Sequence, residues 1–204
     1  MRALLLAVLA STVPAAGQDS PVDTLTAQPE EGDFFEDPEL YALTFGAGCS
    51  LACGIGWMLG ATSELEPQSG FTYGVSNLSD QDVTTAWIEG VPGNGEGEAV
   101  TALFCYGPDE GTVPFRGLTI MDGYAKSEGA WASNGRVHLL EMRLNGETLH
   151  FIELSDVRQP QHVGWQEEIP VRNGDLLELV VVSVYPGLSY EDTAITDLIF
   201  WGAH

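Results

Sequence analysis

The stretch TTAWIEGVPGNGEGEAV, residues 84–100, combines closely spaced glycines with carboxylates. Such a loop could cradle a phosphate, hold a metal ion, supply an acid/base pair, or simply turn the chain. The phosphate alternative requires a strand before the loop and a helix after it, so that helix amides face the anion. Here residues 99–107 follow as a predicted strand, and Glu96 and Glu98 would repel a phosphate. The loop therefore does not predict a nucleotide site.

Catalytic arrangements of other kinds are not indicated either. A glycosidase pair needs two carboxyl groups at a defined separation and with different pKa values. With 30 acidic residues in the chain, a close pair is expected by chance. No Gly-x-Ser-x-Gly motif, which would place a serine nucleophile, is present. We predict no catalytic residues and no enzyme activity.

The three cysteines allow one disulfide and one remaining thiol. We expect a local Cys49–Cys53 disulfide, with Cys105 in a strand. The spacing differs from the Cys-x-x-Cys pattern of thioredoxin-like redox proteins. The four histidines show no paired spacing, so a zinc site is not predicted.

The N-terminus and the charge indicate an exported protein. Residues 1–17 carry Arg2, the apolar run ALLLAVLA and small residues near the expected cleavage point, the pattern of a signal peptide. We therefore expect a secreted or periplasmic protein. The net charge of −23 disfavours nucleic acid and anionic membranes as partners, because such a surface repels both.

Two segments precede the predicted domain core. Residues 18–40 are acidic and proline-containing, a composition that cannot bury enough apolar surface to fold alone, so we predict a disordered segment. Residues 42–62 are uncharged and long enough to be considered as a membrane span. Their glycines and their lack of flanking Lys or Arg argue against a span, and we expect an irregular buried segment with an early strand.

The rest of the chain carries strand signals. Residues 136–144 alternate apolar and polar side chains, residues 176–185 are β-branched and apolar on both faces, and residues 195–202 form a last candidate strand. Asn145-Gly146 is a type I′ hairpin signal. No stretch shows a convincing helical period, so residues 41–204 predict one all-β sandwich or jelly-roll domain.

A series of motifs resembles a known family. In order they are CSLACG, NLSDQDVTTAWIEGVPGNGEGE, DGYAKSEGAWASNGRV, LSDVRQPQHV and TAITDLIFWG. Together they resemble the NADase-type glycan-binding domain, also described as an NAD glycohydrolase translocation domain, a discoidin-like relative of the coagulation factor type C modules. The resemblance implies a discoidin-like (galactose-binding-like) jelly roll of about eight strands in a secreted bacterial protein that binds rather than cleaves. One departure is Asp122, where the family pattern leads us to expect asparagine.

The resemblance also places the glycine loop. It implies a connection from an early strand to the next, with Trp87 buried in the core and glycines at positive φ where the chain doubles back. On this interpretation Glu89 and Glu98 bond to backbone amides or face solvent, without a catalytic role.

The segment DGYAKSEGAWASNGR supplies the candidate ligand-binding residues. Aromatic faces suit the apolar face of a sugar ring, and polar side chains can bond to its hydroxyls. The candidates are Tyr124, Lys126, Trp131, Asn134 and Arg136. The alternative is that the aromatic residues pack against the sandwich while Asn134 and Arg136 fix the turn.

The resemblance further implies a structural calcium ion, which discoidin-like carbohydrate modules often bind in the matching turn. The ligand set carried over is Asp80, Asp82, Thr85 and Asp197. The alternative is a turn whose aspartates are satisfied by neighbouring amides.

We therefore predict a secreted, non-catalytic carbohydrate-binding module with a structural calcium site. The alternative is an extracellular protein–protein interaction or assembly module without a sugar site. The expected partner is a glycan or an extracellular protein.

Overall fold

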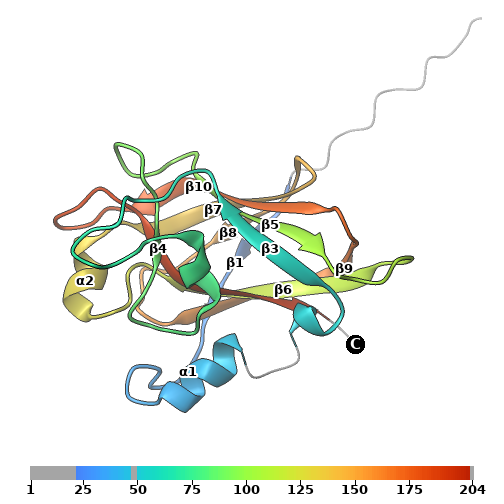
Figure 1. The fold of residues 1–204 in the computed structure, drawn as a ribbon, viewed down its shortest axis with the longest axis horizontal. Coiled ribbons are helices and arrows are strands. Elements are labelled where there is room, and N and C mark those ends of the chain that lie inside the picture. Colours follow the sequence, from blue (N-terminus) through green and yellow to red (C-terminus); the bar gives the residue numbers. More distant parts are fainter. Residues whose placement is uncertain (1–21, 47–49, 203–204) are drawn as a thin grey trace, which may run out of the picture.

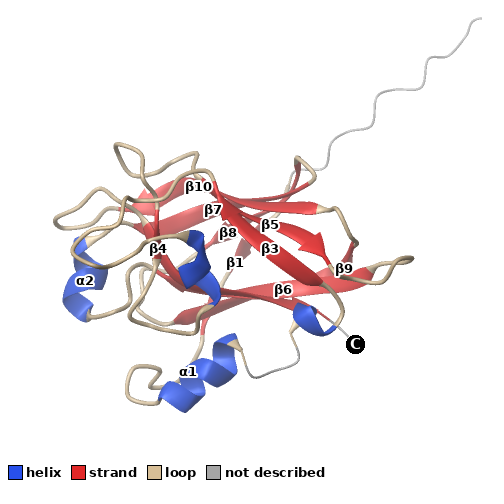
Figure 2. Cartoon of the chain, in the orientation of Figure 1, coloured by secondary structure: helices blue, strands red, loops and turns tan. Residues whose placement is uncertain are grey.

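The computed structural model describes residues 22–46 and 50–202, which form a sandwich of two β-sheets (Figures 1 and 2). The predicted signal peptide, residues 1–17, lies outside the described residues, as does Cys49 with the predicted Cys49–Cys53 disulfide. The elements in chain order are β1 (Thr24–Thr26), β2 (Gln28–Pro29), α1 (Pro38–Phe45), η1 (Leu51–Cys53), β3 (Gly56–Ala61), η2 (Val75–Ser79), β4 (Trp87–Ile88), β5 (Ala99–Cys105), β6 (Val113–Asp122), α2 (Glu128–Ser133), β7 (Arg136–Leu144), β8 (Glu147–Glu153), β9 (Pro160–Val171), β10 (Leu176–Tyr185) and β11 (Ala194–Gly202).

Six strands form one sheet in the order β1-β8-β7-β10-β5-β3, and five form the other in the order β2-β9-β6-β11-β4. Strands β3 and β5 to β11 have six or more residues, whereas β1, β2 and β4 have two or three. The two sheets lie one above the other in Figure 1, with α1 below the sheet that contains β6. The predicted all-β sandwich of about eight main strands is confirmed.

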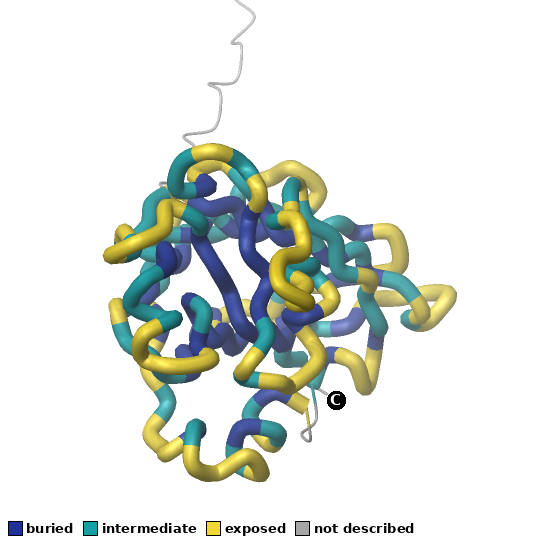
Figure 3. Tube along the Cα trace, turned by 60° about the vertical axis from the view of Figure 1, so that its left-hand side comes forward, coloured by how far each residue is buried: buried dark blue, intermediate teal, exposed yellow. Residues whose placement is uncertain are grey.

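The core between the sheets is rich in aromatic side chains. Phe104, Phe115 and Phe200 are fully buried. The Phe115 and Phe200 rings meet edge to face, with ring centres 5.6 Å apart. Trp87 is also fully buried, and its indole N–H donates to the Ser63 carbonyl at 3.0 Å. The prediction that Trp87 belongs to the core is therefore confirmed. In Figure 3, the buried parts of the chain lie in the middle of the molecule and exposed loops surround them.

The strands with clear period-2 patterns were predicted correctly. β7 and β10 have the expected bounds, residues 136–144 and 176–185. In β7, Leu140 and Met142 are buried between the sheets and Glu141 lies on the other face. Asn145 and Gly146 have φ values of 54° and 82°, the left-handed conformation that a type I′ turn requires, and they join β7 to β8.

The N-terminal segment differs from the prediction of disorder over 18–40. Residues 18–21 lie outside the described residues, but β1 pairs in parallel with β8 and β2 pairs with β9. Pairing at a sheet edge uses backbone groups, so an acidic segment can join the fold without a core of its own. Residues 22–40 therefore belong to the same folded unit as the predicted domain, residues 41–204, which corrects the expectation for this part.

Helix α1 was not predicted. Pro38 begins the helix, and the Asp37 carboxylate caps it by accepting the Glu39 and Leu40 amides, each at 3.1 Å. Tyr41 and Phe45 are buried against Met121 and Ile199 on the outer face of the five-stranded sheet. The helix thus covers apolar surface that the sandwich itself leaves open.

The uncharged segment 42–62 contains the end of α1, the turn η1 and the edge strand β3, which confirms the expected early strand. The expected burial is wrong, because only Phe45, Leu51 and Ile55 among its described residues are buried, and an edge strand keeps one side open. Within the described ranges, no helix is long and apolar enough to cross a membrane.

The glycine loop between β4 and β5 turns the chain as predicted. Gly93, Gly95 and Gly97 have φ values of 103°, 71° and 95°. A Cβ on Gly95 would lie 2.5 Å from Cγ of Glu89, so a side chain there would collide with a buried carboxylate. The Glu89 carboxylate accepts the amides of Val91 and Thr193, at 2.8 and 3.3 Å.

Candidate functional site

The predicted ligand residues lie on the connection from β6 to β7, which contains the short helix α2. Ser127 caps α2 by accepting the Ala130 amide at 3.1 Å. Gly123, which follows β6, has a φ of 76°, and a Cβ there would lie 2.6 Å from the Trp131 ring and 2.7 Å from Arg136. The glycine therefore permits both the turn into α2 and the close packing of Trp131 and Arg136 beneath it.

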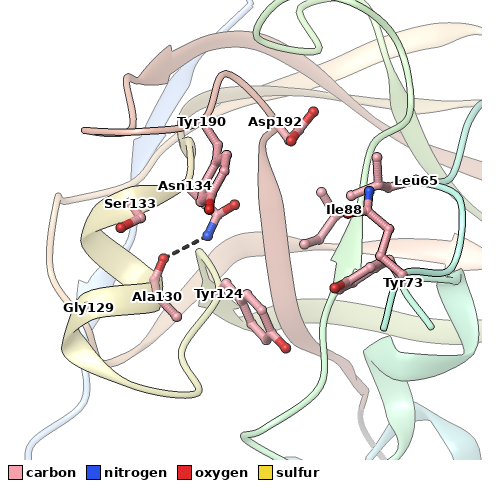
Figure 4. A pocket seen from close by; sticks show the side chains of 11 residues that line it. Leu65, Tyr73, Ile88, Tyr124, Gly129, Ala130, Ser133, Asn134, Tyr190 and Asp192 are labelled. Carbon is pink, nitrogen blue, oxygen red and sulfur yellow. Dashed lines mark hydrogen bonds between the residues drawn. The ribbon is translucent and has the colours of Figure 1, made fainter. Parts of the chain in front are cut away.

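A cavity of about 510 Å³ opens beside α2 (Figure 4). Three connections build it: β3 to β4, β6 to β7, and β10 to β11. Its lining residues are Leu65, Gln68, Tyr73, Ile88, Tyr124, Gly129, Ala130, Ser133, Asn134, Tyr190 and Asp192. In Figure 4, Tyr73, Leu65 and Ile88 face Tyr190 and Asn134 across the opening, with Tyr124 at its base.

The lining combines aromatic faces with unused hydrogen-bonding groups. Tyr73 and Tyr124 meet edge to face, with ring centres 6.4 Å apart. Within the described part of the chain, the hydroxyls of Tyr73, Tyr124 and Tyr190 make no hydrogen bond. The Asn134 amide donates to the Ala130 carbonyl at 2.7 Å, which fixes its side chain and leaves its oxygen as an acceptor. A ligand with apolar patches between hydroxyl groups could use both features.

One carboxylate belongs to the cavity wall. Asp192 is half-buried, and burial raises the pKa of its carboxyl, an effect that the neighbouring Glu191 increases. Burial likewise raises the pKa of Glu89, the residue after Ile88, and the Asp192 charge contributes to that rise.

Lys126 lies close to the cavity without lining it. Its ammonium nitrogen is 4.0 Å from the centre of the Phe71 ring and 6.0 Å from that of Tyr124. The lysine therefore borders the Tyr124 side of the opening, with its ammonium against the Phe71 ring.

Trp131 and Arg136 do not line this cavity. Trp131 lines a second cavity, of about 430 Å³, together with Phe35, Glu128, Ala132 and Arg158. Its indole N–H donates to the Asp122 carbonyl at 3.2 Å, and the Arg136 guanidinium lies 4.6 Å from its ring centre. Of the five predicted residues, Tyr124 and Asn134 therefore line the first cavity, Trp131 lines the second, and Lys126 and Arg136 line neither. The two cavities share α2, because adjacent residues of a helix point in different directions.

Arg136 is almost fully buried and forms a bidentate ion pair with Asp156. Its Nε donates to Oδ1 at 2.9 Å and its Nη2 donates to Oδ2 at 3.0 Å. It also donates to the Asn134 and Pro186 carbonyls. These bonds join α2 to the β10–β11 connection, which matches the alternative that Arg136 fixes the turn.

The predicted calcium ligands form a hydrogen-bonded turn. Asp80 accepts the Asp82 amide at 3.0 Å and the Thr85 hydroxyl at 2.8 Å. Asp197 is buried and accepts the Tyr41 hydroxyl at 2.7 Å. Within residues 22–46 and 50–202, no group of three or more His, Cys, Asp or Glu side chains is arranged to hold a metal.

One observation nevertheless favours a cation near Asp197. Its Oδ1 is buried and accepts no hydrogen bond of ordinary geometry within the described residues, although the Gln81 backbone N–H lies close enough to lower the pKa of the carboxyl. Burial raises the pKa of Asp197 to about 7, the Tyr41 bond opposes this rise, and the charges of Asp80 and Asp82 add to it. An oxygen-binding cation would satisfy that acceptor and reduce the repulsion among the three carboxylates. The residues thus fit a calcium ion in donor type.

Sequence reasoning missed several cavity residues, among them Tyr73, Tyr190 and Asp192. The available signal was their place in loops: Tyr73 and Tyr190 each lie in a short Gly- and Ser-containing stretch, where an aromatic residue has no strand to pack on. That signal does not show that the two loops meet.

A family model described as "NAD glycohydrolase translocation F5/8 type C domain" matches residues 53–201, which confirms the resemblance carried by the motifs. No curated protein sequence matches the chain.

One solved structure shows the same fold, and a second aligns more weakly. The CBM32-1 and CBM32-2 domains from Clostridium perfringens ZmpB align with a TM-score of 0.56 at 9% identity, over 91% of this chain and 43% of that one. Arabinofuranosyltransferase AftD from Mycobacteria aligns with a TM-score of 0.49 at 16% identity, over 72% of this chain and 11% of that one. This chain therefore corresponds to less than half of either structure. The likeness to the ZmpB domains confirms the predicted discoidin-like jelly roll.

Proposed function

The chain belongs to the NAD glycohydrolase translocation F5/8 type C domain family, and from the cavity beside α2 we propose that it is a secreted, non-catalytic module that binds carbohydrate there. The observation that carries the proposal is the lining itself. Tyr73, Tyr124 and Tyr190 offer aromatic faces and hydroxyls that bond to no described residue, and Asn134 offers a fixed acceptor.

Sugars need this mixture, because their rings present C–H patches surrounded by hydroxyl donors and acceptors. The connections that build the cavity are positioned by a rigid sandwich, the usual arrangement for binding loops. The fold shared with CBM32 domains, a class of carbohydrate-binding module, supports the same function.

A structural calcium ion forms part of this proposal. It would be held by Asp80, Asp82, Thr85 and Asp197, and Asp197 would connect it to the last strand. Its effect would be on the stability of the turn before β4, which leads into the cavity wall at Ile88.

The second candidate is an extracellular protein–protein interaction module. The observation in its favour is the exposure of Leu188, at 84%, beside Tyr190, at 58%, in the β10–β11 connection. Exposed apolar side chains next to a cavity also suit a protein partner.

A glycan array separates the two candidates. The carbohydrate proposal predicts a defined set of bound glycans that Tyr190→Ala removes. An empty array together with a protein recovered reproducibly by pull-down would favour the interaction module and reject the sugar site.

A further inference from the structure

The carboxylates at the cavity set its charge. Asp192 lines the cavity, and the buried Glu89 follows the lining residue Ile88 in the chain. Neither forms an ion pair within the described part of the chain; the Glu89 oxygens bond to the Val91 and Thr193 amides. Burial raises the pKa of both carboxyls, and neighbouring acidic groups add to the rise: Asp192 and Glu98 for Glu89, and Glu191 for Asp192. The carboxyl groups at this cavity therefore have no ion-pair partner among the described residues.

Among the residues that the structure describes, those that line the cavity include no Lys, Arg or His. The chain has only seven Lys and Arg residues against 30 Asp and Glu, and Lys126 is its only lysine. The Lys126 ammonium is directed to Phe71, 4.0 Å from its ring centre. A negative cavity in a molecule of net charge −23 attracts cations and repels anionic sugars.

The tyrosine rings favour a cation as well. An ammonium group within about 6 Å of an aromatic ring centre is attracted by the electrons of the ring face. The chain already shows this contact, because Lys126 places its ammonium 6.0 Å from the centre of the Tyr124 ring. The Tyr73 ring meets Tyr124 edge to face, and Tyr190 lies across the cavity from Tyr73 (Figure 4). A second ammonium could therefore contact aromatic rings and a carboxylate together.

We propose that the cavity selects glycans that carry a free ammonium group, as in de-N-acetylated amino sugars. The ammonium lies against Asp192 and the tyrosine rings, and the sugar hydroxyls bond to Asn134 and the tyrosine hydroxyls. The inference rests on the proposed function, since it names the class of sugar that the same site takes.

The test compares two oligosaccharides of equal length, a glucosamine hexamer and an N-acetylglucosamine hexamer, by titration calorimetry at 150 mM salt. We expect the glucosamine hexamer to bind at least about tenfold more tightly, the strength of one added charge-assisted contact. Asp192→Asn should remove most of that preference while the acetylated hexamer binds as before.

A polycation also binds an acidic protein without a site, so the control must carry the same charge change elsewhere. Asp109→Asn alters an exposed carboxylate between β5 and β6, outside the cavity, and should keep the preference. If Asp109→Asn and Asp192→Asn reduce binding equally, the attraction is diffuse and the inference is wrong. Equal affinity for the two hexamers would also overturn it, while an array hit that depends on Tyr190 would leave the proposed function standing.

Discussion

Asp122 is a buried side chain at a position where the resemblance leads us to expect asparagine. It is almost fully buried, and its Oδ1 accepts the Val137 amide at 3.0 Å. Burial raises the pKa of Asp122 to about 8, although backbone bonds and Arg136 oppose the rise. With this pKa the carboxyl would be protonated and neutral at pH 7, like the asparagine that the resemblance leads us to expect.

This pKa predicts a pH dependence of stability. An unfolded aspartate titrates near pH 4, so between about pH 4 and 8 the unfolded chain releases a proton that the folded chain keeps. Asp122 therefore lowers stability as pH rises through this window, by at most about 1.4 kcal/mol per pH unit. Asp122→Asn should remove this loss, because the amide oxygen can accept the same Val137 N–H.

Urea unfolding at pH 4.5, 6 and 7.5 measures the effect. The stabilisation by Asp122→Asn should grow with pH, whereas Asp109→Asn, an exposed control, should give curves parallel to those of the unaltered protein. A pH-independent effect of Asp122→Asn would show that Asp122 is ionised in the fold.

The turn at Asp80 carries the calcium prediction. For an affinity of about 0.1 mM, within the range of extracellular modules, 1 mM calcium stabilises the fold by about 1.4 kcal/mol. This corresponds to a rise in melting temperature of about 3–6 °C for a domain of this size. Asp80→Ala should abolish the rise and Asp109→Ala should not. Melting curves that coincide in calcium and in chelator would reject the ion and leave Asp80 as a turn residue.

At the scale of elements, α2 is the feature that organises the site. It contributes Gly129, Ala130 and Ser133 to one cavity and Glu128, Trp131 and Ala132 to the other. The sequence predicts a mixed aromatic and polar segment here, but a six-residue helix has too few turns to show a periodic pattern. Because α2 was not predicted, the candidate residues of this segment were predicted to form one ligand site.

Trp131 should therefore behave as a packing residue that also borders a cavity. Trp131→Ala removes contacts with Gly123 and Arg136 and a hydrogen bond to the Asp122 carbonyl. We expect a loss of about 1–3 kcal/mol of stability, less than the roughly 3–5 kcal/mol for the fully buried Trp87. Thermal unfolding measures both variants. An unchanged melting temperature for Trp131→Ala would restore it as an exposed ligand platform.

The strands show what could be predicted at this scale and what could not. β7, β10 and the Asn145-Gly146 hairpin follow local rules, period-2 alternation and turn conformation, so their bounds were found from the sequence. β1 and β2 depend on the edges of β8 and β9, which no local pattern reveals. Helix α1 could have been found from Asp37 and Pro38, an N-cap and first-turn pair.

For the whole molecule, the site is a product of topology. The cavity residues run from Leu65 to Asp192, and the sandwich brings the three connections together at one end. Residue types can be read from the sequence, but the proximity of distant loops cannot. Tyr124 and Asn134 were therefore predicted as ligand residues from one motif, whereas Tyr73 and Tyr190, which lie in two other connections, were not. The same topology places Asp197, on the last strand, beside the turn at Asp80.

The charge of the whole molecule acts on this end of the sandwich. A net charge of −23 disfavours anionic glycans at any site and leaves neutral or cationic ones. The short-range contacts then decide affinity, because long-range attraction is screened at physiological salt.

The most direct test of carbohydrate binding in the cavity is titration of the strongest array glycan into three proteins. These are the unaltered chain, Tyr190→Ala in the cavity wall, and Tyr106→Ala, an exposed tyrosine between β5 and β6. We predict that Tyr190→Ala weakens binding at least about tenfold, the value of one aromatic contact with a sugar ring. Tyr106→Ala should bind as the unaltered chain does, and all three should keep their melting temperatures within about 3 °C. Full affinity in a folded Tyr190→Ala protein would contradict the assignment of this cavity as the sugar site.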